Sequence, residues 1–538
     1  MKSSLFQAAL KRAWPAVVCS ALLLIAGTNA APQASPPTAA VVVSCDQVVG
    51  LVKKTVFGNN VIAAPHPGFS QPRRYEDYGA GLWNPKTGRP VQEVLDLAAR
   101  AGVGMLRFPG GCGAHHYSWK KAVGRGRNQL LFGLDEYLRI CERLGVESVI
   151  TVSYFTGDEG DAADLVAYLN APTGGGADGR SLGRAKERAA NGHPEPYGVK
   201  YFEIGNEVWH GDHERIKSVG PAEYGARYAK YYGAMKAVDP TIKIGAVFQA
   251  LPWGRRWNEA VLEVIRDKLD FAVLHLYPSP VPGTTAEKRA RLEAMGPEEI
   301  FRDLLSPTLV AEERNLEDLR LLVKAAAGKE VPLAVTEYNG DFIQDRPVPY
   351  RHSLGTALMN AELLRIFMKP EHDVLMANYW HLCNGYWGMI YTADDYTREL
   401  GKVDYRKRPN YFVYELYHRS FGPQLLAAQV TGPPAGSEGD SSPYLTVNAS
   451  KSMDNKTIYL MVVNKHLTSE VKADILLKAF IPAQAARCLI LNGPRIDATN
   501  ESASGAVRVS SREVPIRDHP FTLSFEPHSL TAIAIESR

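Results

Sequence analysis

Two glutamates, each at the end of an apolar segment, are the residues best placed to do chemistry. Glu207 closes the segment Tyr201–Glu207, and Glu337 follows the apolar run Leu333–Thr336. A carboxylic acid can protonate a leaving oxygen while a second, ionised carboxylate attacks the carbon that this oxygen leaves. A retaining glycosidase uses two such groups about 5–5.5 Å apart. The pair predicts this chemistry, with Glu207 as acid/base and Glu337 as nucleophile; the alternative is that both are structural ion-pair partners.

The two glutamates must be brought together by elements far apart in the sequence. Short runs rich in β-branched and aromatic residues alternate with amphipathic helical segments and predict buried strands. The eight predicted strands are Thr55–Val61, Met105–Phe108, Ser148–Phe155, Tyr201–Glu207, Lys243–Gln249, Phe271–Tyr277, Leu333–Tyr338 and Val374–Leu382. Eight strands followed by helices predict an α/β fold, a (β/α)8 TIM barrel, over 51–422, with a doubly wound open sheet as the alternative.

Catalytic residues of such barrels lie at the C-terminal ends of the strands. Glu207 on the fourth strand and Glu337 on the seventh are therefore expected to face one another across the mouth. The segment 173–196 interrupts the alternation between strands three and four, is rich in glycine and charge, and predicts either a lid or a solvent-exposed loop.

The pattern changes beyond residue 423. Apolar residues alternate with others at Ile458, Leu460 and Val462 and again from Phe521 to Phe525, and no helical run interrupts them. Alternation of this kind predicts a C-terminal β-sandwich domain over 423–538. The segment 31–50 is expected to contribute a further strand to it.

Composition restricts the class of protein. The formal net charge is +3, which is too small to suggest a nucleic acid partner. Basic residues at the start, an apolar run over 13–27 and small residues before residue 31 predict a signal peptide over 1–30, with an uncleaved anchor as the alternative. These features predict a secreted or periplasmic protein without stable membrane insertion after cleavage.

Several motifs in order along the chain are similar to those of a known family. The chain resembles the clan A glycoside hydrolases and, within that clan, the arabinofuranosidases of glycoside hydrolase family 51. The motifs that carry the resemblance are Leu106–Gly111, Tyr117–Trp119, Gly205–Glu207, His275–Tyr277, Glu337, Met376–Asn378 and Pro527–Leu530. The resemblance implies an oligo- or polysaccharide substrate, and a homo-oligomer is a further expectation.

The resemblance also implies roles for residues around the two glutamates. Asn206 would hold the sugar on the non-leaving side. Arg107 would fix the carboxylate of Glu337 through charge-assisted hydrogen bonds, as expected for a guanidinium beside a carboxylate. Tyr277 would hydrogen-bond Glu337, and His275 would lie beside it. The alternative for Arg107 is a plain ion pair inside the barrel, which is compatible with the functional role, and the alternative for His275 is a satisfied residue of the core.

Other positions depart from the family pattern in the region expected to recognise the sugar. Cys112 stands where many bacterial members have asparagine, Phe57–Asn60 offers no acid, and His381 replaces a glutamine. Trp380 is a candidate sugar platform, as an aromatic face suits a sugar, and the alternative is a residue of the core. These changes leave α-L-arabinofuranosides, galactofuranosides, D-arabinofuranosides, xylosides, glucuronides and β-glucans open as substrates.

Neither a metal nor a cofactor is expected. The neighbouring residues Cys112, His115 and His116, and then His210, Asp212 and His213, do not follow a recognised zinc spacing. The competing class is a non-catalytic polysaccharide-binding protein. The retention of both glutamates and their neighbours favours an enzyme.

Overall fold

A computed structural model gives the structure of the chain. It describes residues 38–62, 76–124, 127, 132–174, 179–281, 283, 285–342, 349–385, 387–392, 405–435, 442–501 and 505–538. The signal peptide predicted over 1–30 lies outside these residues.

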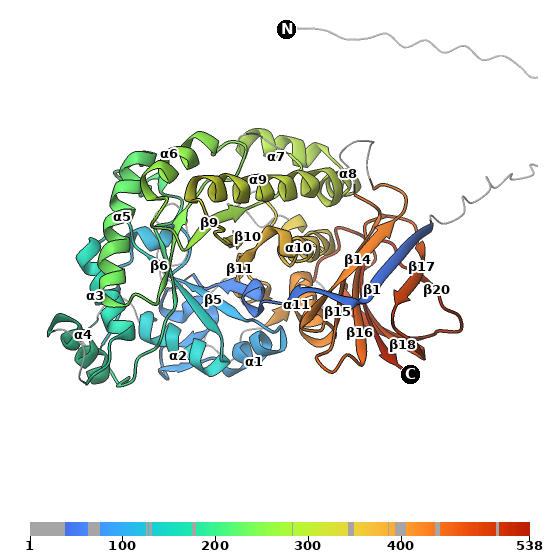
Figure 1. Cartoon of the computed structure of the whole chain (residues 1–538), viewed down its shortest axis with the longest axis horizontal. Helices are drawn as coiled ribbons and strands as arrows, with labels where there is room; N and C mark the ends of the chain where they lie inside the picture. The colour runs from blue at the N-terminus through green and yellow to red at the C-terminus, as the bar shows by residue number, and fades with distance from the viewer. Residues whose placement is uncertain are drawn as a thin grey trace, which may run out of the picture. The chain divides into compact units, whose positions relative to one another are not determined.

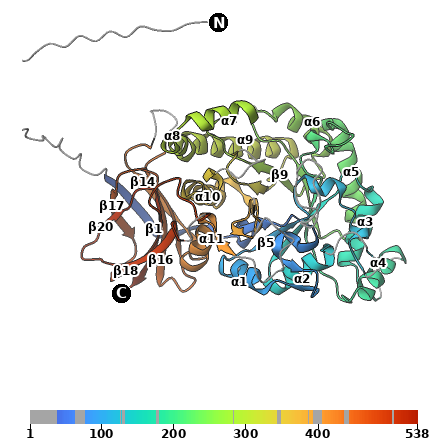
Figure 2. The ribbon, with the colours of Figure 1, turned by 180° about the vertical axis from the view of Figure 1, so that it is seen from behind.

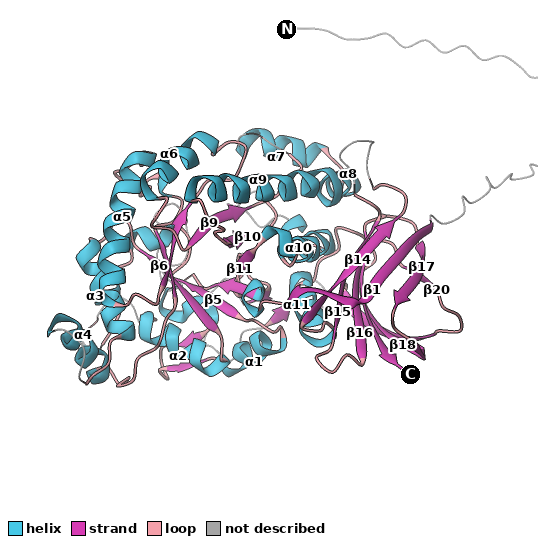
Figure 3. Cartoon of the chain, in the orientation of Figure 1, coloured by secondary structure: helices cyan, strands magenta, loops and turns pink. Residues whose placement is uncertain are grey.

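Eight parallel strands close into a barrel, and helices cover its outer side (Figure 1, Figure 3). In barrel order the strands are β2 (Gly58–Asn60), β5 (Met105–Phe108), β6 (Glu147–Val152), β7 (Tyr201–Ile204), β8 (Lys243–Val247), β9 (Phe271–Leu276), β10 (Leu333–Tyr338) and β11 (Val374–Tyr379). Pairing of β11 with β2 completes the ring. The predicted (β/α)8 barrel is confirmed, and the open-sheet alternative is wrong.

The helices follow the expected alternation. They are α1 (Gln92–Arg100), α2 (Leu134–Leu144), α3 (Glu159–Asn170), α4 (Gly179–Ala190), α5 (Pro221–Val238), α6 (Arg255–Ile265), α7 (Thr285–Ala294), α8 (Pro297–Asp303), α9 (Leu309–Ala327), α10 (Leu354–Phe367) and α11 (Pro409–Ser420). Local signals set several ends: the Asp158 side chain caps α3 by accepting from the Asp161 N–H, and Gly145 ends α2 in the left-handed conformation.

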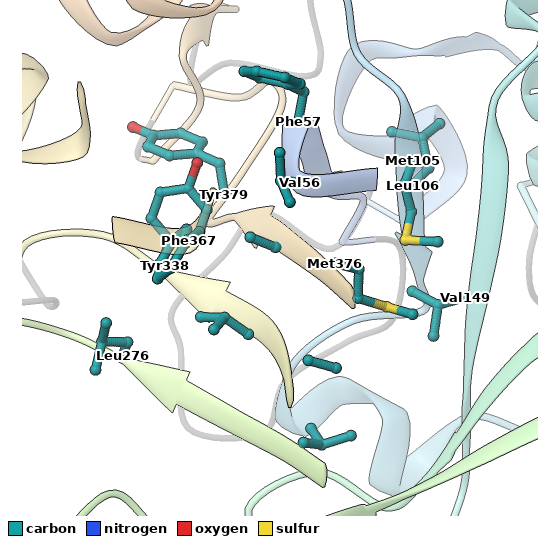
Figure 4. Packing of buried hydrophobic residues seen from close by; sticks show 14 of the residues in the cluster. Val56, Phe57, Met105, Leu106, Val149, Leu276, Tyr338, Phe367, Met376 and Tyr379 are labelled. Atoms are coloured by element: carbon teal, nitrogen blue, oxygen red, sulfur yellow. The ribbon is translucent and has the colours of Figure 1, made fainter. Parts of the chain in front are cut away.

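Aromatic and aliphatic side chains fill the space between strands and helices (Figure 4). Tyr338 of β10 packs against Phe367 of α10, with ring centroids 5.2 Å apart, and against Tyr379 of β11. Its hydroxyl also contacts the Tyr414 hydroxyl of α11 at 2.6 Å, and Tyr414 donates to the Gly58 carbonyl. The hydroxyls of Tyr338 and Tyr414 are therefore satisfied while the rings contribute apolar area.

The segment between β6 and β7 is neither the lid nor the solvent loop that its composition predicts. It contains α4, whose Ala185 is fully buried against Ala167 and Ala171 at the end of α3. The fully buried Arg188 donates to the carbonyls of Tyr168 and Ala171. A run of charged residues thus forms a helix because one of its arginines satisfies backbone acceptors of the neighbouring helix.

The C-terminal domain is one nine-stranded sheet, in the order β19-β18-β21-β16-β15-β14-β1-β17-β20. Its strands are β1 (Thr38–Leu51), β14 (Gln424–Thr431), β15 (Leu445–Lys451), β16 (Thr457–Asn464), β17 (Val471–Lys478), β18 (Pro482–Asn492), β19 (Arg508–Pro515), β20 (Phe521–Phe525) and β21 (Ser529–Ser537). β1, blue in Figure 2, lies among the orange and red strands, antiparallel to β14 and parallel to β17. Residues from both halves of the sheet share one apolar core.

Helix α10 links the barrel to this sheet. Its buried Glu362 accepts a hydrogen bond from Thr446 of β15 and lies 3.9 Å from the ammonium of Lys465, which is itself buried. Leu530 and Ala532 of β21 belong to the same apolar cluster as the barrel residues. The sheet therefore supports the barrel from the side of α10 and α11.

Candidate active site

The two glutamates project from the fourth and seventh barrel strands, counted from β2. Glu337 is part of β10, whereas Glu207 lies three residues beyond the end of β7 with a φ of 40°. The turn between depends on Gly205, which has a φ of 80°, and a Cβ there would lie 2.7 Å from a methyl group of Val208. Both the conformation and the space at this position require glycine.

His275 of β9 lies between the two glutamates. Its Nδ1 is 2.7 Å from Glu207 Oε1 and 3.5 Å from Glu337 Oε2. One oxygen of each carboxylate and one nitrogen of the ring all lie within 4.8 Å of one another. The Glu207 side chain is 23% exposed and that of Glu337 is 6% exposed, so the deeper carboxylate is Glu337.

Arg107 of β5 organises the floor of the site. It is fully buried and donates from Nη1 to Glu337 Oε1 at 2.7 Å and from Nη2 to Asn206 Oδ1 at 2.7 Å. Nη1 also donates to Asn60 Oδ1 at 3.0 Å. Burial by itself lowers the pKa of Arg107, but the charges of Glu203 and Glu337 outweigh it and raise the pKa. The guanidinium is therefore a fixed cation beside Glu337.

Glu203 is a member of this group that the sequence reasoning missed. It lies in β7, is fully buried, accepts from Arg107 Nε at 2.5 Å and accepts from Thr151 Oγ1 at 2.6 Å. A signal was available, because Glu203 interrupts an apolar strand and an acid buried there needs a partner. Asn60 of β2, which also donates to the Thr336 carbonyl, was missed as well.

Both oxygens of Glu337 accept hydrogen bonds. Arg107 contacts Oε1, and the Tyr277 hydroxyl donates to Oε2 at 2.7 Å. Burial, followed by the charge of Glu337, raises the pKa of Tyr277 well above its ordinary value, so the phenol keeps the proton that it donates. Two donors on one carboxylate stabilise its ionised form and fix its orientation.

The three central groups share protons. Burial would raise the pKa of Glu207, but the hydrogen bond and charge of His275 outweigh it and lower the pKa to about 2. Burial lowers and both carboxylates raise the pKa of His275, and the net shift is upward. Burial raises the pKa of Glu337, against the charges of His275 and Arg107. Both directions favour an ionised Glu207 beside a protonated His275.

Cys112 lies beside the same group. Its sulfur is 4.0 Å from Glu207 Oε2 and accepts from Asn206 Nδ2 at 3.4 Å. Burial, followed by the charges of Glu207 and Glu337, raises the pKa of this thiol well above its ordinary value. Asn206 is thus held at both ends of its amide, by Arg107 and by Cys112.

The two expected residues beyond β11 differ from one another. Trp380 is partly exposed, and the tip of its ring covers Gly111, where a Cβ would lie 2.5 Å from the indole. His381 is fully buried, and its Nε2 contacts the Asn384 amide nitrogen at 3.1 Å. Burial and then the charge of Arg408 lower the pKa of His381 to about 3. Trp380 is available to a ligand, whereas His381 is enclosed by protein.

Among the described residues, two groups of side chains have the types and spacing to hold a metal ion. One is Glu207 with His275 and Glu337, and the other is Cys112 with His115 and His213. The first group is already engaged with Arg107 and Tyr277.

Two family models match the chain on either side of residue 300. The model of an α-L-arabinofuranosidase 1 domain matches residues 99–286, and that of an α-L-arabinofuranosidase C-terminal domain matches residues 337–529. The first match contains Arg107, Glu207 and His275, and the second contains Glu337. The chain belongs to the clan A glycoside hydrolases of the family 51 type.

Individual relatives agree with this family 51 assignment. The chain is 28% identical over 213 residues to an exo-α-(1→5)-L-arabinofuranosidase of Streptomyces lividans, which covers 36% of this chain and 30% of that protein. It is 23% identical over 492 residues to a probable α-L-arabinofuranosidase C of Aspergillus niger, which covers 82% and 87%. The family 51 α-L-arabinofuranosidase of Thermotoga petrophila is 25% identical, covers 93% of this chain and 100% of its own, and has a TM-score of 0.75.

The chain spans only part of the curated relatives that it matches. The first three are matched over 30%, 50% and 34% of their own lengths. The family rests on the two family models, which together match more than half of the chain.

The predicted secreted or periplasmic location is wrong. Relatives from Streptomyces lividans, Acetivibrio thermocellus, Bifidobacterium longum and Bacteroides ovatus bear names that describe intracellular enzymes. Basic residues before an apolar run are a pattern of composition alone, and the segment that shows it lies outside the described residues. Within the described part of the chain, each helix is too short or too polar to cross a membrane.

Proposed function

We propose that this protein hydrolyses the glycosidic bond of α-L-arabinofuranosides with retention of anomeric configuration. Glu337 is the nucleophile and Glu207 is the acid/base. The observation that carries the proposal is that both carboxylates lie next to His275 and that one oxygen of Glu207 lies within 4.8 Å of one oxygen of Glu337. Retaining enzymes keep their carboxyl groups about 5–5.5 Å apart, whereas inverting enzymes need about 6.5–9.5 Å to admit a water.

The donors around each glutamate support this division of labour. Glu337 accepts from Arg107 and Tyr277, which favours an ionised carboxylate ready to attack. Glu207 contacts His275 at 2.7 Å, so one proton can reside on either group. Moving that proton to Glu207 gives a neutral acid and a neutral imidazole without changing the number of protons in the site.

In the first step Glu337 attacks the anomeric carbon, the bond from that carbon to the leaving oxygen breaks, and the proton of Glu207 passes to the oxygen. In the second step Glu207 takes a proton from water, the water oxygen bonds to the anomeric carbon, and the carboxylate of Glu337 leaves. His275 holds Glu207 in place through both transfers. The greater exposure of Glu207 fits this role, because it must reach the leaving group and water.

The choice of α-L-arabinofuranose follows from the named relatives, several of which are α-L-arabinofuranosidases. Asn206 is held by Arg107 so that its amide nitrogen points to Cys112, beside the sugar site. A bound hydroxyl can accept from that nitrogen in place of the weakly accepting sulfur. Trp380 supplies an aromatic face, and Arg107 remains below the nucleophile.

A panel of nitrophenyl glycosides tests the substrate: α-L-arabinofuranoside, α-D-arabinofuranoside, β-D-galactofuranoside, β-D-xylopyranoside and β-D-glucuronide. The proposal predicts the highest kcat/KM on the first. Proton NMR of the first-formed sugar should show the α-anomer. Faster turnover of another glycoside would refute the substrate, and a first-formed β-anomer would refute the mechanism.

A further inference from the structure

Cys112, His115 and His213 come from two loops that follow different strands. Cys112 and His115 belong to the short 3-10 helix Cys112–His116 after β5, and His213 follows the 3-10 helix Val208–His210 after Glu207. The rings of His115 and His213 have centroids 6.0 Å apart. One ligand atom from each of the three residues lies within 4.8 Å of the others. The sequence spacing hides this cluster because His213 lies about a hundred residues beyond Cys112 and His115.

We propose that Cys112, His115 and His213 bind one thiophilic divalent cation such as Zn²⁺, and that its binding stops turnover. A sulfur and two imidazoles are ligands that zinc prefers, and three protein ligands leave a fourth position open. Around a tetrahedral zinc, such ligand atoms are about 3.4–3.6 Å apart, which follows from its bond lengths. Closing the cluster requires shifts of about 1 Å, and His213 is an exposed residue of a loop.

The second ligand group is a poorer site for the same cation. Glu337 is 2.7 Å from the buried guanidinium of Arg107, which repels any further positive charge there. Its other oxygen is taken by Tyr277, and Glu207 is taken by His275. The Cys112 sulfur, in contrast, accepts from the Asn206 amide at 3.4 Å and donates to Glu207 Oε2 only at 4.0 Å.

Inhibition follows from the position of the sulfur. Cys112 Sγ is 4.0 Å from Glu207 Oε2, so a cation on the sulfur attracts that carboxylate or takes it as a fourth ligand. Glu207 can then no longer carry the proton between water and the leaving group. The binding claim stands on the three ligands alone, whereas the inhibition rests on the proposed function.

Cobalt absorption tests binding without reference to activity. Full-length protein freed of metal by a chelator, and then of chelator, is titrated with Co²⁺. We expect a single site with a thiolate-to-cobalt charge-transfer band and the visible bands of four-coordinate cobalt, displaced by Zn²⁺. Cys112→Ser should abolish the charge-transfer band. His213→Ala, at an exposed position that should not affect folding, should weaken binding at least about tenfold. His210→Ala, three residues away, is the matched control and should keep both bands and affinity.

Turnover is measured on the wild type over the same range of Zn²⁺. Loss of activity that follows occupancy, with recovery on adding chelator, supports the inhibitory half, and unchanged turnover at full occupancy overturns it. The binding claim is overturned if the charge-transfer band is missing, if it survives both Cys112→Ser and His213→Ala, or if His210→Ala abolishes it. If no glycoside is hydrolysed at all, the proposed function fails while the cobalt titration still decides the site.

Discussion

Arg107 and Asp164 each gather several opposite charges, but in contrasting surroundings. Arg107 is a single, fully buried cation in contact with the carboxylates of Glu203 and Glu337 inside the barrel. Glu207 adds a third carboxylate, separated from Glu337 by His275, whose Nδ1 is 2.7 Å from Glu207 Oε1 and 3.5 Å from Glu337 Oε2. Negative charge therefore exceeds positive charge inside the barrel, where removing a charge from water costs the most free energy.

Asp164 of α3 lies in a cluster whose charges balance. It contacts Lys120, Arg180 and Arg184, whose side chains are 34%, 61% and 28% exposed. Lys120 also pairs with Asp161, and Arg184 also pairs with Glu187. Two of the cations come from α4, so the cluster connects the inserted helix to α3. Water screens these pairs, and each contributes little energy.

Charge is balanced in the exposed cluster and unbalanced in the buried one. On α3 and α4 the paired, solvated charges hold two helices together. Inside the barrel mouth no gain in stability explains three carboxylates around one guanidinium, and their mutual repulsion is what makes their protons movable. Substitutions in the two clusters should therefore have different effects.

The largest expected effect is on Glu337. Glu337→Gln should lower kcat by at least about 10,000-fold, as removal of a nucleophile does, because the amide cannot attack the anomeric carbon. The fold and sugar binding should persist, as seen by circular dichroism and by calorimetry with arabinose. Glu293→Gln, at an exposed position of α7, is the matched control and should leave kcat unchanged. Retention of more than a tenth of the activity by Glu337→Gln would show that Glu337 is not the nucleophile.

Glu203 is expected to act through Arg107. Glu203→Gln keeps the shape but removes the charge opposite the guanidinium, so Arg107 should shift and displace Glu337. We predict a fall in kcat of about 100-fold with little change in KM. Unfolding should become easier by about 3–5 kcal/mol, because one partner of a buried ion pair is lost.

Thr151→Val is the matched variant for Glu203. It removes the hydroxyl that donates to Glu203 but leaves the charge, and it should cost about 1–3 kcal/mol of stability with kcat nearly retained. Equal losses of kcat in Glu203→Gln and Thr151→Val would show that the charge of Glu203 has no role in positioning.

His275 should set the alkaline limb of the pH profile. In the wild type the proton shared with Glu207 is lost only above the raised pKa of His275, so acid catalysis survives to a pH above the ordinary histidine value. In His275→Gln the proton depends on Glu207 alone, a carboxyl group. The alkaline limb of kcat/KM should therefore move to lower pH. An unchanged limb would mean that the shared proton does not reside on this pair.

The smallest effect is expected at Asp164. The pKa of Asp164 is lowered: burial would raise it, but the hydrogen bonds from Arg180, Lys120 and Arg184 outweigh burial. A lowered pKa gives stability that is present above the unfolded value and lost as the pH falls through the folded value. Asp164→Asn should cost about 1 kcal/mol or less at neutral pH, with kcat unchanged. Urea melts at neutral pH and at about pH 2 should show the difference shrink in acid. A difference that grows in acid would contradict the account of this cluster.

Much of the barrel could be predicted because its strands are short and apolar and its helices have one apolar face. Tyr224, Tyr228, Tyr231 and Met235 of α5 recur at helical spacing, and all four are fully buried. The insertion could not be predicted in the same way. What decides it is a set of hydrogen bonds from Arg188 to carbonyls of another helix, and no local pattern encodes them.

Residues of the active site could likewise be predicted only where a pattern along the chain marks them. The two glutamates could be found from their places at strand ends, and Arg107 from the resemblance. Glu203 could not be singled out, because one acid within an otherwise apolar segment leaves the prediction of a buried strand unchanged. The cluster of Cys112 with His213 depends on two loops meeting in space, which spacing along the chain does not reveal.

Capture of the covalent intermediate tests the central claim most directly. In Glu207→Ala, an aryl α-L-arabinofuranoside with a good leaving group needs no acid, so Glu337 can still be glycosylated while deglycosylation is slow. Intact-mass spectrometry should show the addition of one pentosyl residue, and peptide mapping should locate it on Glu337. A pentosyl group on any other residue, or release of the aryl group with no adduct and with inverted configuration, would contradict the account.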